Sequence, residues 1–487
     1  MDVTSQNNNK NANDPEPKKK ETLYASHVKI HPQDIGGFFR KLKWWTVAVL
    51  LGIYYILPWF RWHRGEGAPT QAVLADMEGR RLYFFEIEIW PQEIYYLTGL
   101  LILAAVGLFF VTSLAGRVWC GFLCWQTVWT DLFMLVERWI EGDRNKRMRL
   151  DAAPYGLRKI GLRTAKHIAW LFISLATGGA WILYFNDAPT IAVTFFTGEA
   201  TMTEYGFIGL FTATTYVLAG LAREQVCIYM CPWPRFQGAM FDEHSLLVTY
   251  EEWRGEPRGK AKNKEKESLG DCVDCNLCVN VCPTGIDIRN GSQMQCIGCA
   301  LCVDACNSIM DKLKRPRGLV RYDSLTKIKA RAEGRETKNR IIRPRTIGYV
   351  VLMMIVVFTM VYGYASRLTV ELNVQRDRAP LFVRLSDGSI RNGYTLKILN
   401  MERKPMTFTL HVEHIKNARV SVVGINKGDE ALIGLPVKPD QVGTYKVFVS
   451  ARPEDIEAGG NDMDLVVTDI ATGASTTQDT SFYGPDK

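Results

Sequence analysis

Eight cysteines between residues 272 and 306 constrain this chain more than any other feature of its sequence. They form two runs with intervals of two, two and three residues: Cys272, Cys275, Cys278 and Cys282, then Cys296, Cys299, Cys302 and Cys306. Loops this short allow three thiolates of one run to bind neighbouring corners of a single [4Fe–4S] cluster. Zinc sites and disulfide knots are the alternatives, but zinc ligands come as four residues in pairs and fit this doubled spacing poorly.

The two runs have the spacing of two-cluster bacterial ferredoxins, in which the fourth cysteine of each run binds the cluster of the other run. We therefore expect one cluster on Cys272, Cys275, Cys278 and Cys306, and a second on Cys296, Cys299, Cys302 and Cys282. Pro283 follows the first run, whereas Asn307 stands at the matching position after the second. This departure from the ferredoxin pattern leaves all eight expected ligands in place.

Outside this region very apolar segments alternate with very polar ones, which the average composition of 47% hydrophobic and 23% charged residues hides. Five apolar blocks approach the ~20 residues that cross a bilayer as a helix. They cover Trp44–Phe60, Ile94–Leu114, His167–Phe185, Tyr205–Ala222 and Ile347–Tyr364. Aromatic residues concentrate at the ends of the blocks, as at membrane interfaces. The pattern predicts five transmembrane helices rather than buried helices of a soluble protein.

The distribution of lysine and arginine predicts the orientation of these helices, because positively charged loops stay in the cytoplasm. The loop after the second block and the segment 223–345 are rich in both residues, whereas the loop Asn186–Glu204 contains neither. The N-terminus and the cluster region are therefore expected in the cytoplasm, and everything after Tyr364 in the periplasm. The net charge of +8 is unevenly spread along the chain, and its distribution indicates membrane topology rather than a nucleic-acid partner.

After about Leu368 the pattern changes to short runs in which apolar and polar residues alternate. The runs 369–374, 394–399, 407–412, 444–449 and 464–468 each have the period of a β-strand. Roughly seven such strands separated by turn residues are typical of an immunoglobulin-like sandwich. Cysteine and tryptophan are both missing from this region, which excludes the antibody type.

These patterns predict a multidomain membrane protein. Its expected fold class is five transmembrane α-helices, a cytoplasmic ferredoxin-like module with two [4Fe–4S] clusters, and a C-terminal all-β immunoglobulin-like sandwich. The expected order is a cytoplasmic N-terminal tail (1–43), a membrane domain with four transmembrane helices (44–250), a basic tether (251–269), the ferredoxin-type domain (270–316), a basic linker (317–346), the fifth transmembrane helix (347–366) and the periplasmic immunoglobulin-like domain (367–487).

Four further cysteines form two pairs with a spacing of i, i+4: Cys120 with Cys124, and Cys227 with Cys231. On a helix the thiols of each pair would lie on one face, about one turn apart. Both pairs follow the expected cytoplasmic end of a span, so four soft sulfurs would meet there, where the thioether of Met230 could join them. Such a site suits Cu(I) or another soft ion. The pairs could also cycle between dithiol and disulfide, or be small buried residues.

Histidine offers few alternatives for a membrane redox centre. Among the expected spans only His167 could bind haem, and its place at the edge of a block favours an interfacial role. His411 and His414 in the expected sandwich could form a periplasmic metal site.

Taken together, these features resemble the cytochrome c oxidase accessory protein family CcoG/FixG/RdxA. The resemblance rests on the eight cluster cysteines, Cys120–Asp131, Cys227–Gln237, Asp377–Leu381 and Leu385–Lys397. Membrane quinol dehydrogenases of the nitrate-reductase accessory type have a proline after each thiol pair. Here Pro232 preserves that feature, and Trp125 replaces the other proline.

The resemblance implies an iron–sulfur electron-transfer protein of the bacterial cytoplasmic (inner) membrane. It would reduce Cu(II) to Cu(I) for the copper centre of a cbb3-type cytochrome c oxidase, with the two thiol pairs as catalytic and copper-binding residues. The implied partners are that oxidase, its copper-delivery machinery, the lipid bilayer and an electron donor that the sequence does not identify. There are two alternatives: an electron relay between the quinone pool and a partner redox enzyme, and a non-catalytic assembly scaffold. The electron donor is not identified because no dinucleotide-binding fingerprint follows a strand in the sequence.

Overall fold

The computed structural model describes residues 29–65, 68–260, 269–338, 340–367, 370–425 and 433–485. The chain divides into two compact units. The first consists of Met1–Ile56, Gly107–Leu183 and Ala192–Tyr349, and the second of Leu57–Val106, Tyr184–Ile191 and Val350–Lys487. The predicted tail up to residue 28 and residues 261–268 of the predicted tether lie outside the described residues.

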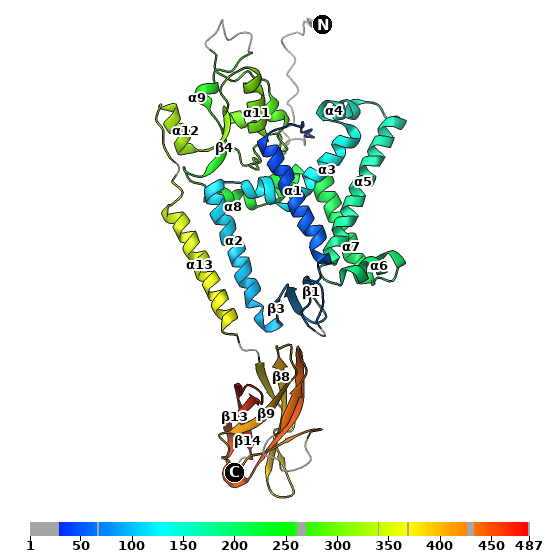
Figure 1. Ribbon diagram of the computed structural model, residues 1–487, viewed down its shortest axis with the longest axis vertical. Helices are drawn as coiled ribbons and strands as arrows, with labels where there is room; N and C mark the ends of the chain where they lie inside the picture. The colour runs from blue at the N-terminus through cyan, green and yellow to red at the C-terminus, as the bar shows by residue number, and fades with distance from the viewer. Residues whose placement is uncertain are drawn as a thin grey trace, which may run out of the picture. The chain divides into compact units, whose positions relative to one another are not determined.

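Among the described residues, four helices are long and apolar enough to cross a membrane (Figure 1). They are Phe38–Trp59 (α1, Phe38–Ile56, with η1, Leu57–Trp59), Pro91–Ala115 (η2, Pro91–Glu93, and α2, Tyr95–Ala115), Met202–Ala222 (α7, Met202–Thr215, with η4, Tyr216–Ala222) and Pro344–Ala365 (α13). They match four of the five expected apolar blocks. The chain is therefore a multi-pass membrane protein.

The remaining block, His167–Phe185, begins inside the long helix α5 (Leu157–Ile182), which is not among these four. Basic residues in the first half of α5, including Lys159, Arg163 and Lys166, lower its mean hydropathy. The fifth span therefore stays a prediction.

The N-terminal boundary of the first helix differs from the expected one. Helix α1 begins at Phe38, so residues 38–43 are helical and not part of a tail. The backbone N–H of Arg40 donates to the Asp304 carboxylate at 2.8 Å, and a carboxylate is stabilised at a helix N-terminus. Lys43 is only 2% exposed because its ammonium group pairs with Asp131 at 2.8 Å.

The cluster region extends beyond its predicted limits. Strand β4 (Leu246–Tyr250) pairs antiparallel with β5 (Val320–Ser324), from Leu246↔Ser324 to Tyr250↔Val320. This pair joins the segments on both sides of the cysteine runs. The other helices of the first unit are α3 (Trp125–Glu141), α4 (Arg144–Ala152), α8 (Trp233–Met240), α9 (Glu252–Gly255), α10 (Leu277–Asn280), α11 (Leu301–Lys312) and α12 (Leu325–Ala332). Helix α6 (Ala188–Thr197) has residues in both units.

The second unit contains a two-sheet sandwich and a small sheet of β1 (Val73–Asp76), β2 (Arg81–Phe84) and β3 (Ile87–Ile89). The sandwich sheets have the orders β10-β12-β8-β6, with β7 on β8, and β11-β9-β13-β14. The strands are β6 (Val370–Arg376), β7 (Val383–Arg384), β8 (Ile390–Asn400), β9 (Met406–Glu413), β10 (Arg419–Val422), β11 (Gly434–Val437), β12 (Gln441–Ala451), β13 (Gly459–Asp469) and β14 (Ser475–Gly484). Inward-facing residues of both sheets, such as Leu396 and Leu465, form the core.

The alternating runs in the sequence correspond to β6, β8, β9, β12 and β13, so the immunoglobulin-like sandwich is confirmed. Strands β7, β10 and β11 are only two to four residues long, too short for a reliable period-two pattern.

Candidate electron-transfer site

Cys272, Cys275, Cys278 and Cys306, which we call the first ferredoxin set, line one small cavity of about 20 Å³. Burial, together with the neighbouring thiols of Cys278, Cys272 and Cys275, raises the pKa of Cys306 to about 12. Cys275 is the exposed member of the set. The structure thus brings together the four thiols that the crossed ferredoxin pattern predicts.

Cys282, Cys296, Cys299 and Cys302 form the second ferredoxin set, and none of them is exposed. Burial raises the pKa of Cys299 to about 12, although the charge of Lys43 opposes this shift, and the thiols of Cys282 and Cys296 act in the same direction as burial. The thiols of Cys299, Cys296 and Cys282 in turn act on Cys302, so these four thiols also lie within electrostatic reach of one another.

The local backbone explains how each ferredoxin loop suits an anionic cluster. Asn276 and Ala300 follow the second cysteine of each run, and both have a left-handed backbone with φ of 56°. A left-handed residue beside right-handed ones turns successive backbone N–H groups to one side, and such concavities bind anions. A [4Fe–4S] cluster held by four thiolates is anionic, so both loops fit this group.

The two remaining pairs, Cys120, Cys124, Cys227 and Cys231, form the membrane thiol set. In each pair the first cysteine lies on a single π-helical turn, η3 (Trp119–Leu123) or η5 (Val226–Met230), instead of an α-helix, and the second cysteine caps that turn. The backbone N–H of Cys124 closes its turn on Trp119 O at 2.8 Å, and that of Cys231 closes on Val226 O at 2.8 Å. Burial, together with the thiols of Cys124, Cys227 and Cys231, raises the pKa of Cys120 to about 12. The structure therefore unites the two pairs.

The membrane thiol set packs directly against the second ferredoxin set. Cys120 and Cys227 belong to an apolar cluster that also contains Cys299 and Cys302. Gly121 lies so close to the second ferredoxin loop that an added Cβ would be 3.0 Å from both the Cα and the backbone N of Cys299. This distance is tighter than nine in ten real Cβ contacts, so a larger residue here would push the second ferredoxin loop away by a few tenths of an ångström.

Arg117 and Gln237 hold this contact together. The buried guanidinium of Arg117 donates to the carbonyls of Met294, Cys296 (2.8 Å) and Pro234 (2.8 Å), which links η3 to the ferredoxin loop and to α8. The thiol of Cys120 donates to the Gln237 side-chain oxygen at 3.3 Å. Gln237 is 1% exposed, so this partner is shielded from water.

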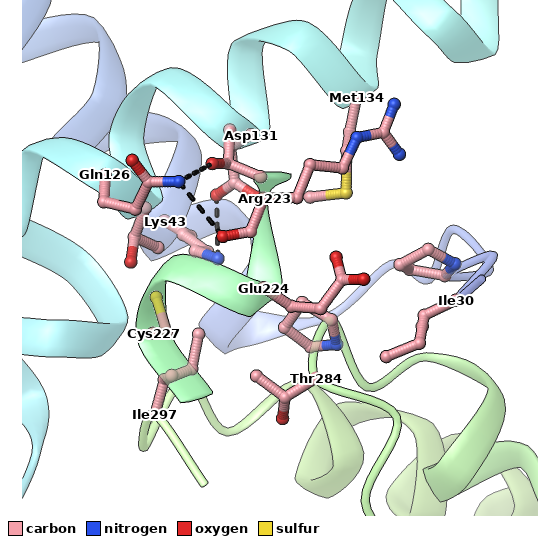
Figure 2. Close-up of a pocket in the computed structure, with 14 residues that line it drawn as sticks. Ile30, Lys43, Gln126, Asp131, Met134, Arg223, Glu224, Cys227, Thr284 and Ile297 are labelled. Atoms are coloured by element: carbon pink, nitrogen blue, oxygen red, sulfur yellow. Dashed lines mark hydrogen bonds and ion pairs between the residues drawn. The ribbon is translucent and has the colours of Figure 1, made fainter. Parts of the chain in front are cut away.

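A cavity of about 30 Å³ adjoins the membrane thiol set and is lined by Lys43, Asp131, Glu224 and Cys227 (Figure 2). One edge is held by Gln126, whose amide donates to the backbone oxygens of Leu218 (2.8 Å) and Arg223 (3.1 Å). This volume is enough for a water molecule, since a site needs only about 10–15 Å³ for one probe-sized solvent molecule.

A buried charge network includes Arg223, which precedes η5 in the sequence. Glu137 on α3 pairs with Arg147 at 2.9 Å, Arg223 at 3.0 Å and Lys166 at 3.5 Å. Burial would raise the pKa of the Glu137 carboxyl, but these cations outweigh it and lower the pKa to about 2. The network fixes Arg223, four residues before Cys227.

Comparisons with known proteins agree with this arrangement. A family model described as "4Fe-4S dicluster domain" matches residues 222–325, one described as "4Fe-4S binding domain" matches residues 97–147, and one for the "IG-like fold at C-terminal of FixG" matches residues 360–485. The nitrogen fixation protein FixG of Rhizobium meliloti (strain 1021) is 50% identical over 457 residues, covering 88% of this chain and 87% of that protein. The chain belongs to the FixG/RdxA family. Proteins RdxB and RdxA of Cereibacter sphaeroides are 47% and 48% identical over 470 and 448 residues, which are 95% and 91% of this chain and 98% and 94% of theirs.

This FixG/RdxA family member is therefore an iron–sulfur electron-transfer protein. Sequence reasoning missed Arg117, Gly121 and the Lys43–Asp131 pair. Asp131 and Gln237 are the last residues of Cys120–Asp131 and Cys227–Gln237, two of the segments that carry the family resemblance. That resemblance was the available signal for these two residues. The contacts themselves join residues more than 80 positions apart and have no local pattern.

Proposed function

We propose that this FixG/RdxA family member transfers single electrons from its iron–sulfur clusters to Cu(II), and so supplies Cu(I) for the copper centre of a cbb3-type cytochrome c oxidase. The observation that supports this most is the contact of Gly121 with Cys299, because it connects the membrane thiol set to the second ferredoxin set. Each turnover takes up one electron from a donor and reduces one Cu(II) ion to Cu(I), so the electrons balance.

Exposure suggests the direction of transfer. Cys275 is exposed in the first ferredoxin set and Cys231 in the membrane thiol set, whereas the second ferredoxin set between them has no exposed thiol. Electrons would enter near Cys275 and leave near Cys231. Met230, beside Cys231, is 63% exposed and adds a thioether. Soft sulfur donors stabilise Cu(I) over Cu(II), which favours the reduced product.

The expected domain organisation, with clusters in the cytoplasm and the sandwich in the periplasm, belongs to this proposal. Helices α2 and α7–η4 each lead into a thiol turn, and the two turns meet, so the chain must cross the membrane between them. Helix α5 is the segment suited to this crossing, since 26 residues extend about 39 Å at about 1.5 Å per residue. It packs tightly on α7, where a Cβ at Gly178 would be 2.7 Å from Ile208 O. Five spans result.

The test is single-turnover reduction of Cu(II) by dithionite-reduced protein, followed with a Cu(I)-specific chelator. We expect the double variant Cys227→Ser, Cys231→Ser to reduce Cu(II) slowly while the signals of the ferredoxin sets persist. Met230→Leu should slow capture of copper. The matched control is Met202→Leu, because Met202 is a methionine 86% exposed at the first residue of α7, the helix whose span leads to η5. Unchanged rates in the double variant would refute the proposed route.

A quinol donor is the second candidate, and one cavity favours it. His167 Nδ1 and the Tyr216 hydroxyl are 2.8 Å apart and line a cavity of about 410 Å³ with apolar walls, including Ile168 and Leu171. This volume is within the usual range for small-molecule sites, about 300–1,000 Å³. A quinol there would feed a relay between the quinone pool and a partner redox enzyme. If purified protein oxidises quinol and His167→Ala abolishes this without lowering Cu(II) reduction by dithionite, the cavity is the donor site.

A further inference from the structure

The two turns of the membrane thiol set are structurally equivalent half-sites. In each, the first cysteine is the second residue of a five-residue π-helical turn, and the second cysteine is the residue that caps the turn. Cys124 and Cys231 both have extended backbones, with ψ of 130° and 120°. Each turn therefore offers two thiols in the same local geometry, and two turns together offer four.

The twelve cysteines of the chain fall into three sets of four. Within the first ferredoxin set, Cys306 is influenced by the other three thiols, and Cys120 is influenced by the other three of the membrane thiol set. All twelve are free thiols in the structure, and none forms a disulfide. The membrane thiol set thus repeats the number and grouping of donors found in each ferredoxin set.

The distance between sulfur atoms distinguishes a site for a cluster from a site for a single metal ion. Four sulfurs around one tetrahedral ion with bonds of about 2.3 Å lie about 3.8 Å apart. Among the described residues, Glu413, His414 and Asp464 form the group in which three potential ligand atoms all lie within 4.8 Å of one another. This group contains no thiol. No three sulfurs of the membrane thiol set or of either ferredoxin set, all of which the structure describes, therefore lie within 4.8 Å of one another. A [4Fe–4S] cluster requires a spacing wider than that of a single-ion site, because each thiolate binds a different iron atom.

The surroundings also suit a buried anionic group. Arg117, 6% exposed, and Lys43, 2% exposed, are cations close enough to act on the charges of Cys120 and Cys227, respectively, although the Glu224 carboxylate opposes Lys43 at Cys227. Apolar packing of Cys120 and Cys227 against Cys299 and Cys302 keeps water away from the inner side. Charge, hydrogen bonds and exposure are the features that set the potential of such clusters.

We propose that Cys120, Cys124, Cys227 and Cys231 together bind a third [4Fe–4S] cluster, shared between the two halves of the membrane domain. The inference rests on the proposed function and gives the membrane thiol set an iron–sulfur cluster as its resident group, with copper remaining the substrate. The cluster would accept one electron by way of the second ferredoxin set and release one to Cu(II) beside Cys231. No bond forms or breaks in the protein.

Iron and sulfide analysis of the full-length protein, purified anaerobically in detergent, tests this directly. We expect about twelve iron and twelve acid-labile sulfide atoms per chain, falling to about eight in the double variant Cys120→Ser, Cys227→Ser. The Mössbauer and EPR signals of the two ferredoxin sets should persist in that variant. About eight iron atoms in the wild-type protein, with or without bound copper, would overturn the third cluster.

Thiol alkylation gives a second readout that does not need the variant to fold. Cys231 is exposed, so iodoacetamide should modify it in the folded protein if it is a free thiol. As a cluster ligand it should stay unmodified until iron is removed by acid or an iron chelator, and a Cu(I) chelator should not deprotect it. Rapid modification of Cys231 in iron-replete protein would refute the assignment. Protein with twelve iron atoms that fails to reduce Cu(II) would instead refute only the proposed function.

Discussion

Replacing Glu137 by glutamine tests whether the buried charge network holds the second thiol turn in place. Glu137 is 1% exposed and contacts Arg147, Arg223 and Lys166 at 2.9, 3.0 and 3.5 Å. Burial opposes ionisation of this carboxyl, but the three cations prevail and lower its pKa from 4.5 to about 2. A shift of this size corresponds to about 3 kcal/mol of folding free energy at neutral pH.

We expect Glu137→Gln to lose about 3 kcal/mol of stability at pH 7, because a neutral amide removes the counter-charge of Arg147 and Arg223 and leaves Lys166 with Glu141 alone. The pKa is lower in the folded state than in the unfolded state. The contribution of Glu137 is therefore complete well above about pH 4.5 and disappears as the pH falls towards about 2. The wild-type protein should lose more stability on acidification than the variant does.

The assay is thermal unfolding of the detergent-solubilised protein, followed by circular dichroism at several pH values. Glu141→Gln is the matched control, since Glu141 lies one turn further along α3 and has its nearest cation, Lys166, at 2.8 Å. If both variants melt at the same temperature, or if the pH dependence of Glu137→Gln equals that of the wild type, the network does not provide the stability assigned to it.

Three further predictions concern the site and the topology. Gly121→Ala should push η3 away from the second ferredoxin loop and slow electron transfer to Cu(II) several-fold, because overpacking costs about 1–3 kcal/mol. Gly161→Ala is the control, since nothing lies within 4 Å of the added Cβ, and it should leave the rate unchanged. Stopped-flow measurements compare the two rates. Cys275→Ala should lose or convert one cluster, detected as a lower iron content and an altered EPR spectrum, with a lower melting temperature because clusters stabilise their domain. A reporter fused after Tyr364 should be active only in the periplasm and one fused near Glu265 only in the cytoplasm; the opposite pattern would reverse the proposed orientation.

The sequence predicted those features that have a short-range pattern. Cysteine intervals of two and three residues restrict the loops around the ferredoxin sets, and the period-two runs restrict the strands of the sandwich, so both were expected before the structure. The thiol pairs were expected on α-helices, because an i, i+4 interval also fits an α-helical face. The π-helical turns that carry Cys120 and Cys227 have no distinctive spacing, and their geometry becomes visible only in the hydrogen bonds that close them.

Contacts between distant segments could not be predicted for the same reason. The start of α1 depends on Asp304, which is more than 260 residues away, and polar residues such as Arg40 and Lys43 look like part of a solvated tail until their partners are known. Strand β4 was a short apolar run next to a charged tether, and only pairing with β5 makes it a strand of the cluster region.

Each thiol turn is positioned by residues that neighbour the other thiol turn in the sequence. We call the segments around η3 and around η5 the two halves of the membrane domain, and the membrane thiol set takes two cysteines from each half. Arg117, just before the first turn, donates to Pro234 O in α8, the helix that follows the second turn. Arg223, just before the second turn, pairs with Glu137 in α3, the helix that follows the first. Neither turn is positioned by its own half alone. A metal centre that takes two ligands from each turn can therefore form only when both halves are folded together.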